Sequence, residues 1–101
     1  MPNKLDFELS KLALGDINKI WIYTANNWST TQANKYYKDL FKKINLICIN
    51  PELGRLIESV KPQHRMLRAK SHLIIYKKVK NKIFIDRILH EKMDVENRLN
   101  E

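Results

Sequence analysis

The stretch HRMLRAKSHLIIYKKVKNKIFIDRILHEKMD, residues His64–Asp94, decides the fold. It holds two apolar runs, Leu73–Tyr76 and Ile83–Leu89, which are separated by a lysine-rich segment. β-branched and aromatic residues favour strands, and two such runs around a short polar segment predict a β-hairpin. We expect its turn at Lys80-Asn81, with Asn81 in the left-handed conformation that tight turns need.

This hairpin region carries many cations and few acids. Its acids before Asp94 are Asp86 and Glu91, whereas its histidines and arginines are His64, His72, His90, Arg65, Arg68 and Arg87. Such a surface either binds an anionic group or is simply a well-solvated sheet. Residue types alone leave both interpretations open.

Both faces of the predicted hairpin are partly apolar, because side chains alternate along a strand. With the turn at Lys80-Asn81, His72 and Arg87 share one face with Ile74, Tyr76, Ile83, Ile85 and Leu89. The other face holds Asp86 and His90 with Leu73, Ile75, Val79, Phe84 and Ile88. Helices cover only one face, so the other needs either a partner protein or the chain's own loop and C-terminal turn. The divided cations favour a docking surface over one catalytic cluster.

The N-terminal half predicts a short strand and two helices. Leu5–Leu9 alternates apolar and acidic residues, as in a half-buried strand. Ser10 follows as a helix N-cap, and Asn26-Asn27 is a stop signal. The expected apolar face of this helix consists of Ala13, Ile17, Ile20, Trp21, Thr24 and Trp28.

The second helix begins with a capping box, in which Ser29 caps the amide of Gln32. It ends at Asn50-Pro51, because the residue before proline avoids helical geometry. The short connection makes the two helices an antiparallel hairpin. The expected apolar stripe is Ala33, Tyr37, Leu40, Phe41, Ile44, Ile47 and Cys48.

The rest of the chain completes an α+β fold. Pro51–Gln63 is predicted as a loop in which Gly54 supplies an unusual backbone angle. Strands are expected at Arg65–Arg68, Leu73–Val79 and Lys82–His90, and Asp94 caps a helical turn over Val95–Leu99. The order is β-α-α-β-β-β in one domain over residues 1–101. It places an antiparallel helical hairpin on one face of a small, mainly antiparallel sheet, followed by a short C-terminal helical turn.

Composition excludes several classes of protein. The 101 residues are 44% hydrophobic, which allows a core without disulfides or metal. No run reaches the ~18 apolar residues of a membrane span, and Met1–Asp6 lacks the apolar core of a signal peptide. Cys48, the only cysteine, has apolar neighbours and is expected to be packed. These features predict a cytoplasmic protein, whose net charge of +8 suits nucleic acid, an anionic membrane or an acidic protein.

Few catalytic chemistries fit the residues. No histidine pair has helical metal-site spacing, and two glycines, Gly15 and Gly54, do not make a phosphate loop. We therefore expect neither a metal nor another cofactor. RNA cleavage is the chemistry that composition permits, with histidines moving protons and arginines holding phosphate. Its candidate residues are Arg65, His72, Arg87 and His90, although each arginine is equally suited to pair with a carboxylate.

Several motifs, in order and spacing, resemble the ParE branch of the RelE/ParE toxin superfamily. They are Asp16-Ile17-x-x-Ile20-Trp21-x-Tyr23, Asn50-Pro51-x-Leu53-Gly54-Arg55, Arg65, Ser71-His72-x-Ile74-Ile75-Tyr76-Lys77 and Arg87-Ile88-Leu89-His90-x-x-Met93-Asp94. The likeness spans Leu5 to Leu99. It departs from the family at Lys70, where glycine is frequent, and in the loop Leu56–Gln63.

The resemblance implies the toxin of a type II toxin–antitoxin system, a class tied to growth arrest and plasmid stabilisation. It implies a non-enzymatic inhibitor of DNA gyrase, held by a ParD-like antitoxin with an acidic tail. It implies no membrane partner, and nucleic acid only through the antitoxin or the target. The alternatives are a RelE-like ribosome-dependent mRNA endoribonuclease, which usually has a tyrosine near its C-terminus, and an inert relic. The expected contact residues for target or antitoxin are Arg65, Arg68, His72, Tyr76, Arg87, His90 and Lys92.

Overall fold

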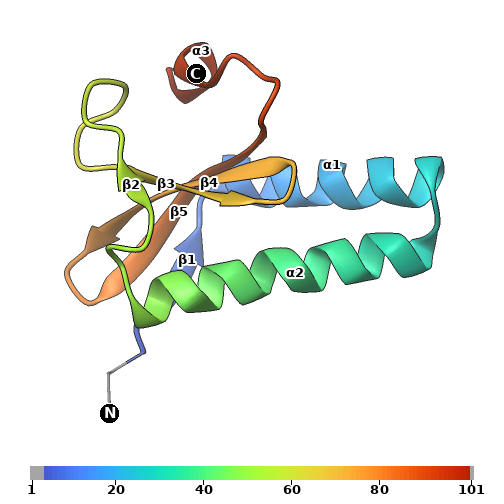
Figure 1. Cartoon of the computed structure of the whole chain (residues 1–101), viewed down its shortest axis with the longest axis horizontal. Helices are drawn as coiled ribbons and strands as arrows, with labels where there is room; N and C mark the ends of the chain where they lie inside the picture. Colours follow the sequence, from blue (N-terminus) through green and yellow to red (C-terminus); the bar gives the residue numbers. More distant parts are fainter. Residues whose placement is uncertain (1–3, 101) are drawn as a thin grey trace.

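The computed structural model describes residues 4–100 and shows a twisted sheet with two long helices lying against one face (Figure 1). The strands run in the order β1-β5-β4-β3-β2. Only the pairing of β1 with β5 is parallel among them. The predicted α+β fold is therefore confirmed. The elements are β1 (Asp6–Leu9), α1 (Lys11–Asn27), α2 (Thr30–Ile49), β2 (Arg55–Leu56), β3 (Arg65–Ala69), β4 (His72–Val79), β5 (Lys82–His90) and α3 (Val95–Leu99).

The predicted caps define both long helices. The Ser10 hydroxyl accepts a hydrogen bond from the Ala13 amide at 2.9 Å, and the Ser29 hydroxyl accepts one from the Gln32 amide at 3.0 Å. Each bond satisfies an amide that has no partner within its own helix. The Trp21 indole N–H donates to Asn34 at 3.0 Å and ties α1 to α2. None of the helices within residues 4–100 is long and apolar enough to cross a membrane.

Some local predictions are wrong. The loop Pro51–Gln63 contains the two-residue strand β2, which pairs with the start of β3 and is too short to show alternation. In the β4–β5 turn the left-handed residue is Lys80, with φ 56°, rather than Asn81. Lys70, in the β3–β4 turn, is left-handed with the same φ. Lysine thus occupies a conformation that glycine adopts at lower cost.

A β-bulge in β5 changes the predicted faces. Tyr76 pairs with Ile85 but Ile75 pairs with Arg87, so Asp86 is an extra residue on β5. Because one added residue reverses the alternation, the faces beyond the bulge are exchanged. Ile88 therefore packs in the helix-side core, and Leu89 in the opposite cluster. His90 joins His72 on the helix side, which corrects the expected division of the cations.

The second face of the sheet is covered by the chain itself. Ile57 in the β2–β3 loop and Leu99 in α3 are buried there against Leu73, Ile75 and Leu89. Figure 1 shows the loop and α3 on the side of the sheet away from α2. The expectation of a large apolar patch that awaits a partner on this face is therefore wrong, and the self-covered alternative holds.

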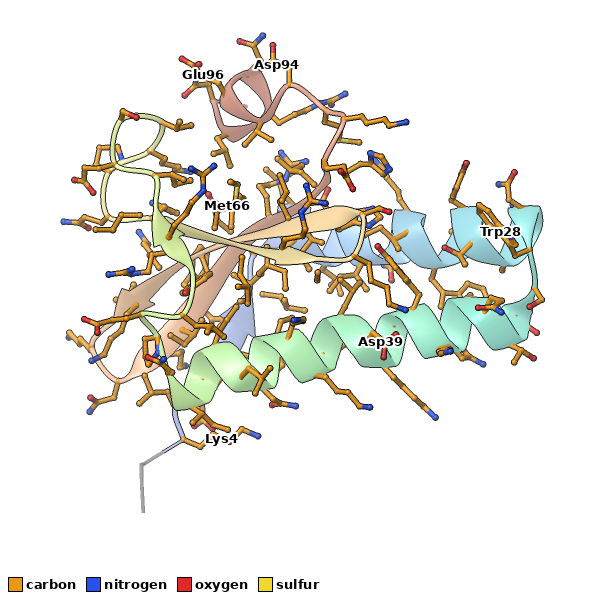
Figure 2. All side chains as sticks on the ribbon, viewed as in Figure 1. Lys4, Trp28, Asp39, Met66, Asp94 and Glu96 are labelled. Atoms are coloured by element: carbon orange, nitrogen blue, oxygen red, sulfur yellow. The ribbon has the colours of Figure 1, made fainter. Side chains whose placement is uncertain are left out.

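The helix-side core is built from the sheet and from one stripe of each helix. Ala13 and Ile17 of α1 are buried, as are five residues of the predicted stripe of α2. Trp28 and Tyr37 were expected in these stripes but are 68% and 43% exposed. Figure 2 shows Trp28 at the far tip of the helical hairpin, beyond the sheet. The sheet is too short to cover that tip.

Candidate functional site

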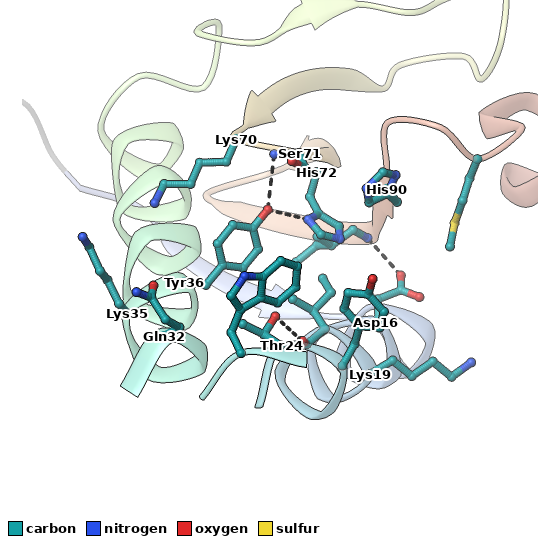
Figure 3. Close-up of a pocket in the computed structure, with 15 residues that line it drawn as sticks. Asp16, Lys19, Thr24, Gln32, Lys35, Tyr36, Lys70, Ser71, His72 and His90 are labelled. Carbon is teal, nitrogen blue, oxygen red and sulfur yellow. Dashed lines mark hydrogen bonds between the residues drawn. The ribbon is translucent and has the colours of Figure 1, made fainter. Parts of the chain in front are cut away.

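A groove of about 660 Å³ lies between the tip of the helical hairpin and the end of the sheet (Figure 3). Its walls come from α1, the α1–α2 connection, α2, the β3–β4 turn and the ends of β4 and β5. Ile20 and Ile88 provide apolar lining, and Met93 follows β5 at one side. The volume falls within the ~300–1,000 Å³ typical of ligand sites.

Three aromatic side chains converge at one end of the groove, which we call the histidine end: Tyr36, His72 and His90. The Tyr36 hydroxyl lies 2.5 Å from Nδ1 of His72. His72 and His90 are directly paired across β4 and β5, with ring centroids 5.2 Å apart in an edge-on arrangement. The Tyr36 oxygen also accepts the Ser71 amide at 3.3 Å. The Tyr36–His72 hydrogen bond holds these two rings against each other, with centroids 5.4 Å apart (Figure 3).

Burial keeps Tyr36 and His72 neutral. Desolvation, aided by the neighbouring His90, lowers the pKa of His72 from 6.5 to about 4. Desolvation also raises the pKa of the Tyr36 phenol above 10.0. At neutral pH, Tyr36 therefore retains its proton and His72 is uncharged.

The rim of the groove combines aromatic surface with positive charge. Tyr23 and Trp28 are 60% and 68% exposed and stack edge to face at 6.1 Å. Lys19, Lys35 and Lys70 line the same groove. Lys70 also pairs with Asp39 at 2.7 Å, and that hydrogen bond lowers the pKa of the Asp39 carboxyl. Exposed aromatic rings such as these are enriched at protein-binding surfaces.

Arg87 has an internal role. Its guanidinium donates to both Asp16 carboxylate oxygens, at 2.9 and 3.0 Å, and to the Arg98 carbonyl at 3.1 Å. Only 9% of the Arg87 side chain and 11% of the Asp16 side chain are exposed. The pair holds α1 against β5, and the Arg87 guanidinium is committed to these contacts.

Tyr76 and Arg65 lie at the other end of the β3–β4 hairpin. Tyr76 is fully buried, so it is inaccessible to a partner in this structure. Its hydroxyl donates to the Pro51 carbonyl at 2.8 Å and accepts the Gly54 amide at 2.7 Å. Arg65 donates to the Gly54 carbonyl at 2.8 Å. Both residues secure the segment between α2 and β2.

Arg68 and Lys92 are exposed to solvent. Arg68 pairs with Glu91 at 3.2 Å. The Lys92 amide donates to Nδ1 of His90 at 3.1 Å. Of the seven contact residues expected from the sequence, the groove is lined by His72 and His90.

The structure does not assemble the four residues of the ribonuclease hypothesis. His72 and His90 are adjacent, but Arg87 is paired with Asp16, and Arg65 lies at the end of β3 opposite the turn that leads to His72. No arginine lines the groove. Within residues 4–100, no three metal-ligating side chains of histidine, cysteine or acid type converge.

Sequence reasoning missed several residues that define the groove. Tyr36 is half-buried on α2, and its spacing of three residues from Ala33 and four from Leu40 was the available signal. Trp28 was assigned to a buried face. Lys19, Lys35 and Lys70 come from separate elements, and only the fold brings them to one rim.

Residues 7–95 match the family described as the ParE toxin of the type II toxin–antitoxin system, parDE. The chain is 34% identical over 92 residues to Toxin ParE1 of Mycobacterium tuberculosis, covering 90% of this chain and 94% of that protein. It is 30% identical over 93 residues to Toxin ParE1 of Caulobacter vibrioides, covering 92% and 96%.

The fold is similar to a chain of a solved structure titled "Chromosomal ParDE TA system from P. aeruginosa". The TM-score is 0.75 at 17% sequence identity, and the match covers 86% of this chain and 96% of that one. The family match extends over most of the chain, and both sequence relatives are matched over nearly their full length. The chain therefore belongs to the ParE toxin family of type II toxin–antitoxin systems, within the RelE/ParE superfamily.

Proposed function

We propose that this ParE-family toxin inhibits DNA gyrase by direct protein–protein contact, without catalysing a reaction itself. We further propose that a ParD-like antitoxin neutralises it by placing an acidic, partly apolar tail in the groove. The observation that carries the proposal is the open groove at the hairpin tip, where exposed aromatic rings meet lysines. Gyrase acts on DNA in the bacterial cytoplasm, which is the expected site of action, and its inhibition leads to growth arrest.

Charge and exposed surface support the antitoxin as an occupant of the groove. The chain carries a net charge of +8, which favours an acidic partner and speeds its association. Trp28 and Tyr23 have the character of interface hot spots, since aromatic rings contribute large contact areas at low entropic cost. An antitoxin that covers these rings would keep the toxin inactive, and its loss would release the toxin. This is the behaviour that a role in plasmid stabilisation requires.

The contacts of the arginines support inhibition by contact rather than by RNA cleavage. A ribonuclease needs cations that hold the scissile phosphate beside its acid and base. Arg87 is bound to Asp16, and Arg65 is bound to the Gly54 carbonyl. The cations that line the groove with His72 and His90 are therefore lysines, and no arginine is among them. We therefore expect toxicity to arise from binding.

A supercoiling assay tests the proposal. Toxin freed of antitoxin should block supercoiling of relaxed plasmid by purified gyrase, and prior addition of antitoxin should restore it. If gyrase contacts this rim, a higher concentration of the Trp28→Ala variant than of the wild-type toxin should be needed to block supercoiling to the same extent. Full supercoiling at high molar excess of folded toxin contradicts gyrase as the target. Cleavage of translated mRNA in the parallel assay would support the ribonuclease alternative.

A further inference from the structure

The two histidines of the histidine end have their Nδ1 atoms occupied. Nδ1 of His90 accepts the Lys92 amide at 3.1 Å, and a backbone N–H can only donate. Nδ1 of His72 lies 2.5 Å from the Tyr36 hydroxyl. The other acceptor within reach of that hydroxyl, the Ala69 carbonyl, is 3.5 Å away, so the phenol proton is best placed on His72.

These bonds determine the tautomers. A neutral imidazole has one protonated nitrogen, so with Nδ1 accepting, both His72 and His90 carry their proton on Nε2. Neither Nε2 has a hydrogen-bond partner within residues 4–100. No fully buried side-chain nitrogen or oxygen in that part of the chain lacks a partner, so neither Nε2 atom is fully buried. Because both residues line the groove, it has two adjacent N–H donors in need of an acceptor.

The surrounding groups favour an anionic acceptor. Asp16, the acid that lines the groove, already binds Arg87 and the Ile88 amide. Glu91, the other acid near His72, pairs with Arg68. Lys19, Lys35 and Lys70 add positive charge to the rim. The walls between these polar groups are apolar, so the best ligand combines an anionic oxygen pair with an apolar body.

We propose that His72 and His90 form a carboxylate subsite, which accepts a glutamate or aspartate of the antitoxin tail while a neighbouring apolar residue packs toward Trp28. Its assignment to the antitoxin rests on the proposed function. The two Nε2–H donors bind the carboxylate oxygens, and Tyr36 fixes the His72 ring from behind. The chemistry selects a carboxylate with an apolar neighbour over either group alone.

Small probes test the subsite on the toxin by itself. Octanoate carries a carboxylate and an alkyl chain, 1-octanol keeps the chain without the charge, and inorganic phosphate keeps an anion without the chain. Binding to the full chain at pH 7 is followed by NMR of the histidine side-chain nitrogens. We expect octanoate to shift both Nε2–H signals and to bind at least tenfold more tightly than either control. Equal binding of 1-octanol or phosphate, or unmoved histidine signals, overturns the subsite.

Two variants separate the donor from the ring. His90→Phe keeps an aromatic ring but removes the N–H, so the preference for octanoate over 1-octanol should fall to less than threefold. His90→Gln keeps an N–H donor and should retain most of the preference. Lys42→Gln, an exposed charge change on α2 outside the groove, should leave it unaltered. An equal loss in the phenylalanine and lysine variants would attribute binding to net charge and overturn the donor role.

The complex with the antitoxin tests the occupant separately. In it, both Nε2–H signals should shift in the direction seen with octanoate, and octanoate should no longer bind. If octanoate binds the free toxin but the Nε2–H signals do not move in the complex, the antitoxin does not occupy the subsite. The proposed binding of its tail in the groove is then also wrong. If octanoate has no effect yet the complex forms over the groove, the carboxylate subsite alone is overturned.

Discussion

Asp16 and Arg87 are joined by two hydrogen bonds, at 2.9 and 3.0 Å, although 71 residues separate them in the chain. The same Asp16 carboxylate accepts the Ile88 amide at 2.9 Å. Strand β1 pairs with β5 only as far as Ile85, so the next part of β5 has no neighbouring strand on that side. Asp16 supplies the acceptor that a strand would otherwise provide. Because Asp16 and Ile88 both line the groove, this contact also holds α1 against β5 there.

Removing the Asp16 carboxylate should be strongly destabilising. Asp16→Ala leaves the buried Arg87 charge without its main partner and the Ile88 amide without an acceptor, which typically costs about 3–5 kcal/mol. Urea unfolding of the purified variant measures the loss. Glu8→Gln, which alters the exposed pair of Glu8 with Lys82, is the control and should change stability by less than about 1 kcal/mol. A similar small loss in both variants would contradict the structural role of Asp16.

The two glycines should respond to alanine in opposite directions. A Cβ at Gly54 would lie 2.7 Å from the Tyr76 hydroxyl oxygen and 3.0 Å from the Met66 carbonyl oxygen, and neither group can move freely. Gly54→Ala should therefore cost about 1–3 kcal/mol. At Gly15, inside α1, a Cβ meets nothing within 4 Å, so Gly15→Ala should add up to about 1 kcal/mol. Thermal unfolding of both variants gives the signs, and equal signs would contradict the packing described.

Acid should destabilise the fold through His72. Its pKa is 6.5 when exposed and about 4 in the folded chain, so the unfolded chain binds the proton more tightly. Stability from this group is fully present above pH 6.5 and is lost as pH falls to about 4. We expect a loss of roughly 1–2 kcal/mol, less than the full shift implies, because the ring is partly exposed.

The comparison of wild type with His72→Gln isolates this group. Urea unfolding at several values between pH 7 and pH 4 should give a steeper fall for the wild type, whereas other acids contribute to both chains alike. Parallel pH profiles would show that His72 titrates normally in the folded chain.

Trp28 should contribute to binding and not to folding. Its side chain is 68% exposed at the rim of the groove. Trp28→Ala should weaken antitoxin binding at least tenfold, since a buried hot-spot tryptophan is worth about 2 kcal/mol or more. Ile22→Ala is the matched control, because Ile22 is 55% exposed on α1 but does not line the groove. Calorimetry of both variants checks this, and equal affinities would place the antitoxin elsewhere.

The sequence predicts those parts of the fold that depend on local signals. Ser10 and Ser29 each have a hydroxyl that needs only the next turn of helix to act as a cap. The bulge at Asp86 depends on how β5 pairs with β4, which local signals do not specify. A prediction that assumed strict alternation through β5 therefore placed Ile88 and Leu89 on the wrong faces of the sheet. Two consecutive polar residues, Asp86 and Arg87, interrupt the apolar run there. They were a usable signal for the bulge.

The candidate site was harder to predict for the same reason. His72 and His90 were identified, but on opposite faces, and only the bulge brings them together. Gly54 was expected to provide an unusual backbone angle, whereas no glycine within residues 4–100 has positive φ and the close approach of Tyr76 explains it instead. The hydroxyl of Tyr36 is hydrogen-bonded to His72, which is 36 residues away in the chain. Such contacts are properties of the packed chain.

Hydrogen–deuterium exchange of the toxin, free and bound to its antitoxin, tests the central claim that the groove is the antitoxin's contact surface. Amides around Tyr23–Trp28 and around Lys70–His72 should exchange more slowly in the complex, together with those that follow His90. The β2–β3 loop at Ile57 should keep its free rate. Protection confined to that loop and to α3, with unchanged exchange around the groove, would contradict the account.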